Sequence, residues 1–213
     1  MSQPFMSLVL TGRNQERLDK AAAEVGAVSW AAFDAADGER LEEFIGGLDV
    51  VDHVLVTAGR PYYGPIAEMD FDAARRDLDE HFWLAFHLAR ALPGKAREGG
   101  SMTLMGGTGG RRTHVGLSLI SAMTAALPAL ARSLALEIAP VRVNLIAAGF
   151  VDTPLSASLL GDGLDDRRAE LRETLPIRRV VGPEDVAALA VHLMVNTALT
   201  GATYDIDGGQ QLV

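Results

Sequence analysis

The chain has 213 residues, no cysteine, 48% hydrophobic residues and a net charge of −9. This length and composition predict one domain, 1–213, with a full core and no disulfide or thiolate metal site, and the acidic balance without a basic stripe argues against nucleic-acid binding. No signal peptide and no apolar run of about 18 to 20 residues is apparent, so we expect a cytoplasmic protein with no membrane partner.

Short β-rich runs alternate with helix-forming stretches along the whole chain. Strands are predicted at 7–12, 27–35, 51–59, 101–107, 141–149 and 201–209, and helices at 15–25, 38–48, 72–91, 117–138, 165–174 and 183–195. The segment 51–59 is a near-continuous apolar run, which predicts a buried strand. Asp70 or Asp72 can cap the third helix, and Pro183 suits the first turn of the last one.

The alternation of strands and helices predicts an α/β fold, a Rossmann-like doubly wound parallel sheet covered on both faces. Ligands of such sheets bind at the carboxyl ends of the strands. Small residues end four of the predicted strands, at Gly12, Ala58–Gly59, Gly106–Gly107 and Ala148–Gly149. These residues suit the close approach of a ligand and equally suit plain strand-to-helix turns, and the residue type alone does not decide between them.

Five segments, in order and at suitable spacing, resemble the short-chain dehydrogenase/reductase family over essentially the whole chain. They are TGRN at 11–14, VTAG at 56–59, the stretch 132–155, GPEDVAALAVHL at 182–193 and TGATYDIDGG at 200–209. One such motif is weak, but five in the family's order are specific. The resemblance implies an oxidoreductase that uses NADP or NAD on a small carbonyl or alcohol substrate.

The resemblance also implies cofactor positions. Arg13 would meet a 2′-phosphate, favouring NADP over NAD, and its alternative role is that of a solvated surface arginine. Asp34 resembles the acidic residue that contacts adenine, and otherwise it caps the following helix. Ala58 and Gly59 would let the cofactor approach closely. The remaining positions are Gly149, Val151 and Thr153, which would hold the nicotinamide carboxamide and the adjoining phosphate. The alternative for these three is plain structural inheritance from the family.

The catalytic positions depart from the family. Its members carry Tyr-x-x-x-Lys, with a serine 13 positions before the tyrosine and an asparagine on the preceding long helix. Those four positions are occupied here, in the order tyrosine, lysine, serine and asparagine, by Ile120, Thr124, Gly107 and His81. Isoleucine cannot exchange a proton, so the standard mechanism is excluded and the catalytic residues stay unknown. The alternative is a non-catalytic relative that binds a ligand or pairs with another subunit.

The family's glycine loop, which binds pyrophosphate at a helix N-terminus, has no counterpart. Only MSQPFM precedes the segment that resembles the family's second strand, so the usual first strand-helix unit is missing. That strand would lie between 7–12 and 51–57. Three explanations are open: the segment 7–12 moves into the central slot, a partner chain covers the gap, or the sequence lacks a segment of the natural protein. The first and third are preferred.

His81 has Asp77 four residues before it on the same predicted helix. A catalytic histidine–carboxylate pair is conceivable, but a partly buried helix histidine with a local partner is the favoured interpretation. His81 and His87 are six residues apart, a poor spacing for a shared metal ion, so we predict no metal site. The resemblance further implies a homo-oligomer, a dimer or tetramer, that associates through 72–91, 117–138 and the C-terminal strand.

Overall fold

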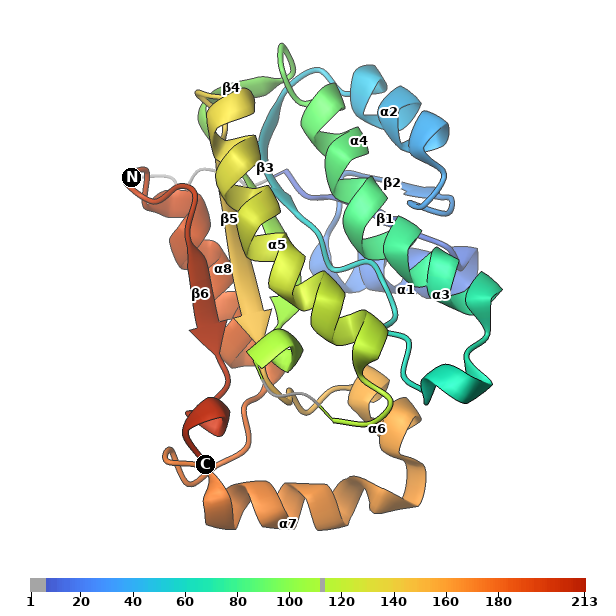
Figure 1. Cartoon of the computed structure of the whole chain (residues 1–213). Helices are drawn as coiled ribbons and strands as arrows, with labels where there is room; N and C mark the ends of the chain where they lie inside the picture. Colours follow the sequence, from blue (N-terminus) through green and yellow to red (C-terminus); the bar gives the residue numbers. More distant parts are fainter. Residues whose placement is uncertain (1–6, 112–113) are drawn as a thin grey trace.

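In the computed structural model, which describes residues 7–111 and 114–213, the strands form two separate parallel sheets (Figure 1). One sheet pairs β1 (Val9–Gly12) with β2 (Ser29–Ala32). The other has the order β3-β4-β5-β6 and consists of β3 (Val51–Leu55), β4 (Ala96–Gly107), β5 (Arg142–Ala148) and β6 (Thr203–Ile206). The predicted α/β fold is therefore confirmed, but its sheet is divided.

Helices connect the strands as the sequence predicts. Their bounds are α1 (Gln15–Val25), α2 (Gly38–Gly47), α3 (Phe71–Leu78), α4 (Leu84–Ala91), α5 (Ser118–Glu137), α6 (Pro154–Leu160), α7 (Leu164–Thr174) and α8 (Pro183–Val195). Short 3₁₀ helices lie at Ile66–Glu68, Gly109–Arg111, Gly161–Gly163 and Gln210–Leu212. The N-cap of α3 is Asp70, one of the two predicted candidates, and its side chain accepts a hydrogen bond from Ala73 N. Helix α6 was not predicted, although Thr153 followed by Pro154 is a start signal.

A π-helical turn, Asp79–Trp83, separates α3 from α4 inside the helix predicted as continuous. A π turn contains an extra residue and changes the direction in which the following side chains point. Asp77, two residues before this turn, and Glu80 within it are both buried, which is unusual for carboxylates. The π turn therefore lies at a pair of buried carboxylates, Asp77 and Glu80.

The division between the sheets decides one of the open questions. β1 pairs with β2, and no described strand pairs with the other edge of β1 or with the free edge of β3. The explanation that 7–12 moves into the central slot is therefore wrong. The prediction that 51–59 is a buried strand is wrong for most of its length, since His53 is exposed and Leu55 is 37% exposed. An apolar run indicates that a strand tends to be buried. Whether the strand is buried depends on a neighbouring strand, which the run itself does not encode.

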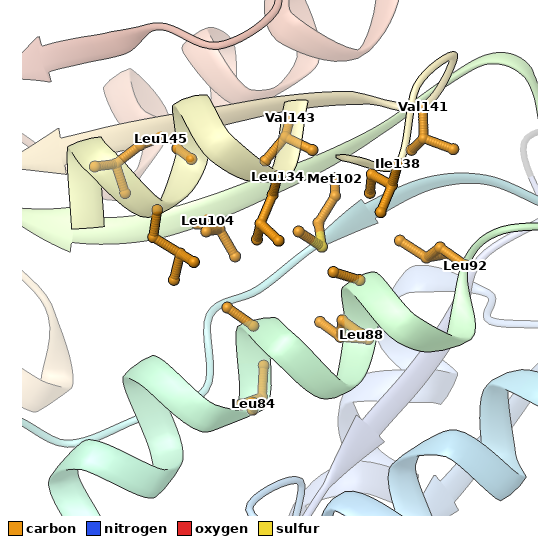
Figure 2. Packing of buried hydrophobic residues seen from close by; sticks show 14 of the residues in the cluster. Leu84, Leu88, Leu92, Met102, Leu104, Leu134, Ile138, Val141, Val143 and Leu145 are labelled. Atoms are coloured by element: carbon orange, nitrogen blue, oxygen red, sulfur yellow. The ribbon is translucent and has the colours of Figure 1, made fainter. Parts of the chain in front are cut away.

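The main core lies between the four-stranded sheet and helices α2, α4 and α5 (Figure 2). Strand β5 contributes to both faces: Val143 and Leu145 belong to this core, whereas Ile146 packs with Leu193 of α8 on the other side. Each fully buried side chain of this size stabilises the fold by about 1.5 to 3 kcal/mol. The side chains drawn in Figure 2 include Leu84, Leu88, Leu92, Met102, Leu104, Leu134, Ile138, Val141, Val143 and Leu145.

Helix α5 is long and apolar enough, by length and composition alone, to cross a membrane. Its buried residues Leu127, Leu130 and Leu134 belong to the main core, which is the pattern of a core helix. The expectation of no membrane partner stays a prediction.

The C-terminal end of α8 is closed by the buried guanidinium of Arg142, the first residue of β5. It donates to Leu193 O at 2.8 Å, Met194 O at 2.7 Å and Leu199 O at 3.0 Å. The last carbonyls of a helix have no partner within the helix. Arg142 supplies that partner and fastens α8 to the sheet.

Candidate functional site

The residues predicted for the cofactor follow the carboxyl ends of β1, β2, β3 and β5, and each end is built differently. The end of β1 passes through Gly12 and Arg13 to α1, whose N-cap Asn14 accepts from Arg17 N at 2.9 Å. The side chain of Arg13 is 59% exposed, yet its Nη1 lies 2.6 Å from Glu80 Oε1. Arg13 is therefore neither a free surface arginine nor a buried one, because one edge of its guanidinium is paired and the remainder is open.

Glu80 links the end of β1 to the loop after β3. Its Oε1 faces Arg13, and its Oε2 accepts a hydrogen bond from Arg60 N at 2.9 Å. The Glu80 side chain is only 11% exposed, so both of its oxygens depend on these partners. No sequence signal predicts the pair with Arg13, because the two residues are 67 positions apart and contact each other only after folding.

The loop after β3 is held by a second carboxylate, Asp77, whose Oδ2 accepts from Tyr62 N at 3.0 Å. Its Oδ1 lies 2.6 Å from His81 Nδ1, and the Asp77 side chain is 1% exposed. Burial lowers the pKa of His81, but its contacts with Asp77 outweigh this effect and raise the pKa above its ordinary value. His81 is partly buried and has the local partner expected of it, because its Nδ1 also lies 3.0 Å from Asp77 O.

Gly59 lies against the His81 ring. Its φ is +115°, and a Cβ built on it would stand 2.4 Å from His81 Nε2. Both facts require glycine here, the first because side chains disfavour that backbone region and the second because the space is filled. Ala58, the preceding residue, is exposed. Gly59 therefore has a packing reason that is independent of any cofactor, whereas Ala58 does not.

Asp34 lies beyond the end of β2 and is exposed. Its Oδ1 accepts from Ala36 N at 3.1 Å, within the turn that leads to α2. The N-cap of α2 is Asp37, whose side chain accepts from Arg40 N. The alternative that Asp34 caps this helix is therefore wrong, because the cap position falls three residues later.

The turn after β5 is tightly packed against the C-terminal segment. A Cβ on Gly149 would lie 2.6 Å from Asp207 Cβ and 2.7 Å from Gln210 Oε1. Phe150 N donates to that same Gln210 oxygen at 2.8 Å. No sequence pattern points to Gln210, which lies after the last matching motif and carries no local signal for this role.

Val151 and Thr153 continue this turn. Val151 forms an isolated parallel bridge with Val181, and its carbonyl accepts from Ser156 Oγ at 2.6 Å. Thr153 caps α6 through its side-chain oxygen, which accepts from Ser156 N at 3.3 Å. A shallow hollow of about 380 Å³ adjoins the turn, lined by Asp152, Thr153, Pro154, Ala157 and Arg168. A second hollow, of about 410 Å³, lies over α2 and includes none of the predicted residues.

The four lost catalytic positions do not all come together. Ile120 is 8% exposed and Thr124 is 6% exposed on α5, and Thr124 Oγ1 donates to Ile120 O at 2.7 Å. Gly107 lies beside Thr124, since a Cβ on Gly107 would stand 3.5 Å from Thr124 Cγ2. His81 contacts Gly59 instead.

The backbone of the loop after β4 fills the space against α5. A Cβ on Gly110 would lie 2.9 Å from both Ser121 O and Ala125 N, and Ser121 Oγ donates to Gly109 O at 3.0 Å. A side chain at this point of the loop would collide with the helix backbone. Within residues 7–111 and 114–213, no group of three histidine or acidic side chains is arranged to hold a metal ion.

Comparison with known proteins gives a consistent set of similarities. The model of a family described as "Enoyl-(Acyl carrier protein) reductase" matches residues 6–211. The human protein "Dehydrogenase/reductase SDR family member 4" is 29% identical over 98% of this chain and 80% of its own length. An "Uncharacterized oxidoreductase" of Mycobacterium tuberculosis is 30% identical over 98% of this chain and 84% of its own length.

Solved structures are similar over nearly the whole chain. A structure titled "small-chain dehydrogenase in complex with NADPH" has a TM-score of 0.82 at 26% identity and covers 98% of this chain and 100% of its own. A short-chain dehydrogenase/reductase from Brucella melitensis has a TM-score of 0.86 at 25% identity, covering 95% and 85%.

Proposed function

The chain belongs to the short-chain dehydrogenase/reductase family of oxidoreductases, and on that premise we propose that it binds NADP and acts on a small carbonyl or alcohol substrate. The observation that carries the proposal is Arg13, a partly open guanidinium at the carboxyl end of a parallel strand. A planar guanidinium suits a phosphate group better than other side chains do, and ligands of such sheets bind at this edge.

The residues present fit the two ends of such a cofactor. At the adenosine end, Arg13 offers the open edge of its guanidinium to a 2′-phosphate, and Asp34 is exposed on the neighbouring strand end. At the nicotinamide end, Val151 and Thr153 follow the turn at Gly149, which the C-terminal segment holds in place. Between the two ends, Gly59 follows β3 and lies against His81.

When bound, a nicotinamide cofactor supplies or accepts a hydride. The chain's own contribution is to hold the phosphate at Arg13 and to keep the turn at Gly149 in place through Gln210. Reduction of a carbonyl also needs a proton on the oxygen, and neither Ile120 nor Thr124 is a group that can transfer one near neutral pH. Any turnover therefore proceeds without the family's tyrosine and lysine.

A second candidate function is that of a non-catalytic relative that binds a ligand or pairs with another subunit. The observation that favours it is the packing of the loop at Gly110 directly on α5, with Thr124 buried beneath. An enzyme of the standard kind places its reacting side chains in that region. The two candidates differ in turnover, which only the first requires.

Tryptophan fluorescence tests the proposal. Trp30 is 41% exposed on β2 and Trp83 is 54% exposed on the π turn, so both can report binding. We expect NADPH to bind more tightly than NADH, because only NADPH carries the 2′-phosphate. Failure of both to bind at millimolar concentration would end the dinucleotide proposal. Binding without NADPH oxidation across a panel of small aldehydes and ketones would favour the non-catalytic candidate.

We also propose a homo-oligomer that associates through the segment 72–91, through 117–138 and through the C-terminal strand. The support is a pair of exposed aromatic side chains, Trp83 at 54% and Phe86 at 38% exposure, whose ring centroids lie 5.5 Å apart. Exposed clusters of this kind often mark protein contacts. Light scattering should give a dimer or tetramer, and a monomeric mass at micromolar concentration would contradict the proposal.

A further inference from the structure

Resting on the proposed binding of NADP, we propose that Glu80 is a positioning residue that sets the preference for a 2′-phosphate by fixing Arg13. Glu80 itself touches no part of the ligand in this proposal. It acts by holding one edge of the guanidinium so that the other edge faces outward at the end of β1.

The geometry around Glu80 is that of a two-point anchor. Oε2 is tied to Arg60 N at 2.9 Å, which fixes the carboxylate plane relative to the loop after β3. Oε1 then presents a fixed acceptor at 2.6 Å to Arg13 Nη1. The anchor spans the division between the sheets, because Arg13 follows β1 and Arg60 follows β3.

The rest of the cluster keeps Glu80 in place. Asp77, three residues earlier, accepts from Tyr62 N, and His81 packs on Gly59, so the loop from Gly59 to Tyr62 is fastened to the helix at several points. Because the loop is fastened, Arg60 N is a fixed donor. The position of Glu80, and through it that of Arg13, is thereby tied to the folded loop.

Arg13 keeps enough donors for a phosphate. A guanidinium has five N–H donors in a planar fork, and Glu80 engages only Nη1. The side chain is 59% exposed, so the remaining donors are accessible. A free arginine must give up much of its rotamer freedom to bind a phosphate, whereas one already held by Glu80 gives up less.

The negative charge of Glu80 acts in the opposite direction, because it repels a phosphate near Arg13. The two effects are separable by experiment. Glu80→Asp keeps the charge but is one methylene shorter, so it cannot reach Arg13 and Arg60 N together. Glu80→Gln removes the charge and leaves only one acceptor oxygen for two donors.

The test compares binding of 2′,5′-ADP and 5′-AMP by isothermal titration calorimetry. We expect both Glu80 variants to weaken 2′,5′-ADP binding by about two- to fivefold, the scale of a partly exposed ion pair, and to leave 5′-AMP binding unchanged. In an Arg13→Ala background the Glu80 substitutions should have no effect. The control Glu16→Gln removes one charge in the first turn of α1, close to Arg13 in the chain, and should not weaken 2′,5′-ADP binding.

Three results would overturn the inference: tighter 2′,5′-ADP binding by Glu80→Gln with wild-type behaviour of Glu80→Asp, an effect that persists without Arg13, or equal loss of both nucleotides. The first would mean that Glu80 repels the phosphate, and the last that it supports only the fold. If the wild-type protein binds neither nucleotide, the proposed function fails as well, and that pattern differs from 2′,5′-ADP binding that is insensitive to Glu80.

Discussion

Replacing Gly59 by alanine probes the contact that holds the loop after β3. The backbone at Gly59 has φ +115°, and an L side chain in this region costs roughly 1 to 2 kcal/mol. The new Cβ would also overlap the His81 ring, at 2.4 Å from Nε2 and 2.5 Å from Cε1. The ring must move, which separates it from the buried Asp77 carboxylate.

Breaking the contacts of His81 Nδ1 with Asp77 O, at 3.0 Å, and with the buried Asp77 carboxylate costs about 1 to 3 kcal/mol. The free energy of unfolding should therefore fall by about 2 to 5 kcal/mol in Gly59→Ala. Gly26→Ala is the matched control, because Gly26 also has a positive φ, +65°, but a Cβ there would meet nothing within 4 Å. The control carries the backbone strain without the collision.

Urea unfolding followed by tryptophan fluorescence measures both variants. We expect Gly59→Ala to lose about 1 to 3 kcal/mol more than Gly26→Ala. In a His81→Ala background the ring is absent, so Gly59→Ala should cost only the backbone strain. Equal losses for the two glycine variants, or an unchanged loss without the His81 ring, would refute the reasoning.

Three further predictions concern the pH response, the end of α8 and the lost catalytic positions. The raised pKa of His81 contributes stability that is complete below its unfolded pKa of about 6.5 and is lost as the pH rises through the higher folded value. In urea titrations above about pH 6.5, wild type should therefore lose more stability with rising pH than His81→Gln, and parallel curves would contradict this. Arg142→Met should lower the free energy of unfolding by about 3 kcal/mol, since it leaves buried carbonyls without a donor, and a loss under about 1 kcal/mol would count against that role. Ile120→Tyr with Thr124→Lys should melt earlier and gain no NADPH-dependent carbonyl reduction, because both positions are buried, and measurable turnover by a stable variant would overturn that expectation.

Local patterns predicted most of the elements because their causes are local. Helix α1 has the predicted bounds, Gln15–Val25, and α8 begins at Pro183, where a proline suits the first turn. The short helix α6 was missed although Thr153 and Pro154 signal its start. The position of strand β3 was predicted correctly, but its burial was not, because burial depends on neighbouring strands that the segment itself does not encode.

The candidate site divides in the same way. The resemblance located Arg13, Gly59 and the turn at Gly149 from residue types in order along the chain. It could not show that Arg13 is paired with Glu80 or that Gly59 packs on His81. Such contacts join residues that are far apart in the chain, and no periodicity or motif spacing carries that information.

The sequence by itself determined the α/β fold, the family and the absence of the tyrosine and lysine, because these depend on residue identity and local order. Only the tertiary structure decided that β1 stays with β2 rather than joining β3, and that Glu80 bridges the two sheets. Strand pairing, and ion pairs between residues far apart in the chain, depend on which distant groups the fold brings together. These contacts depend on the whole molecule and cannot be predicted from any single segment.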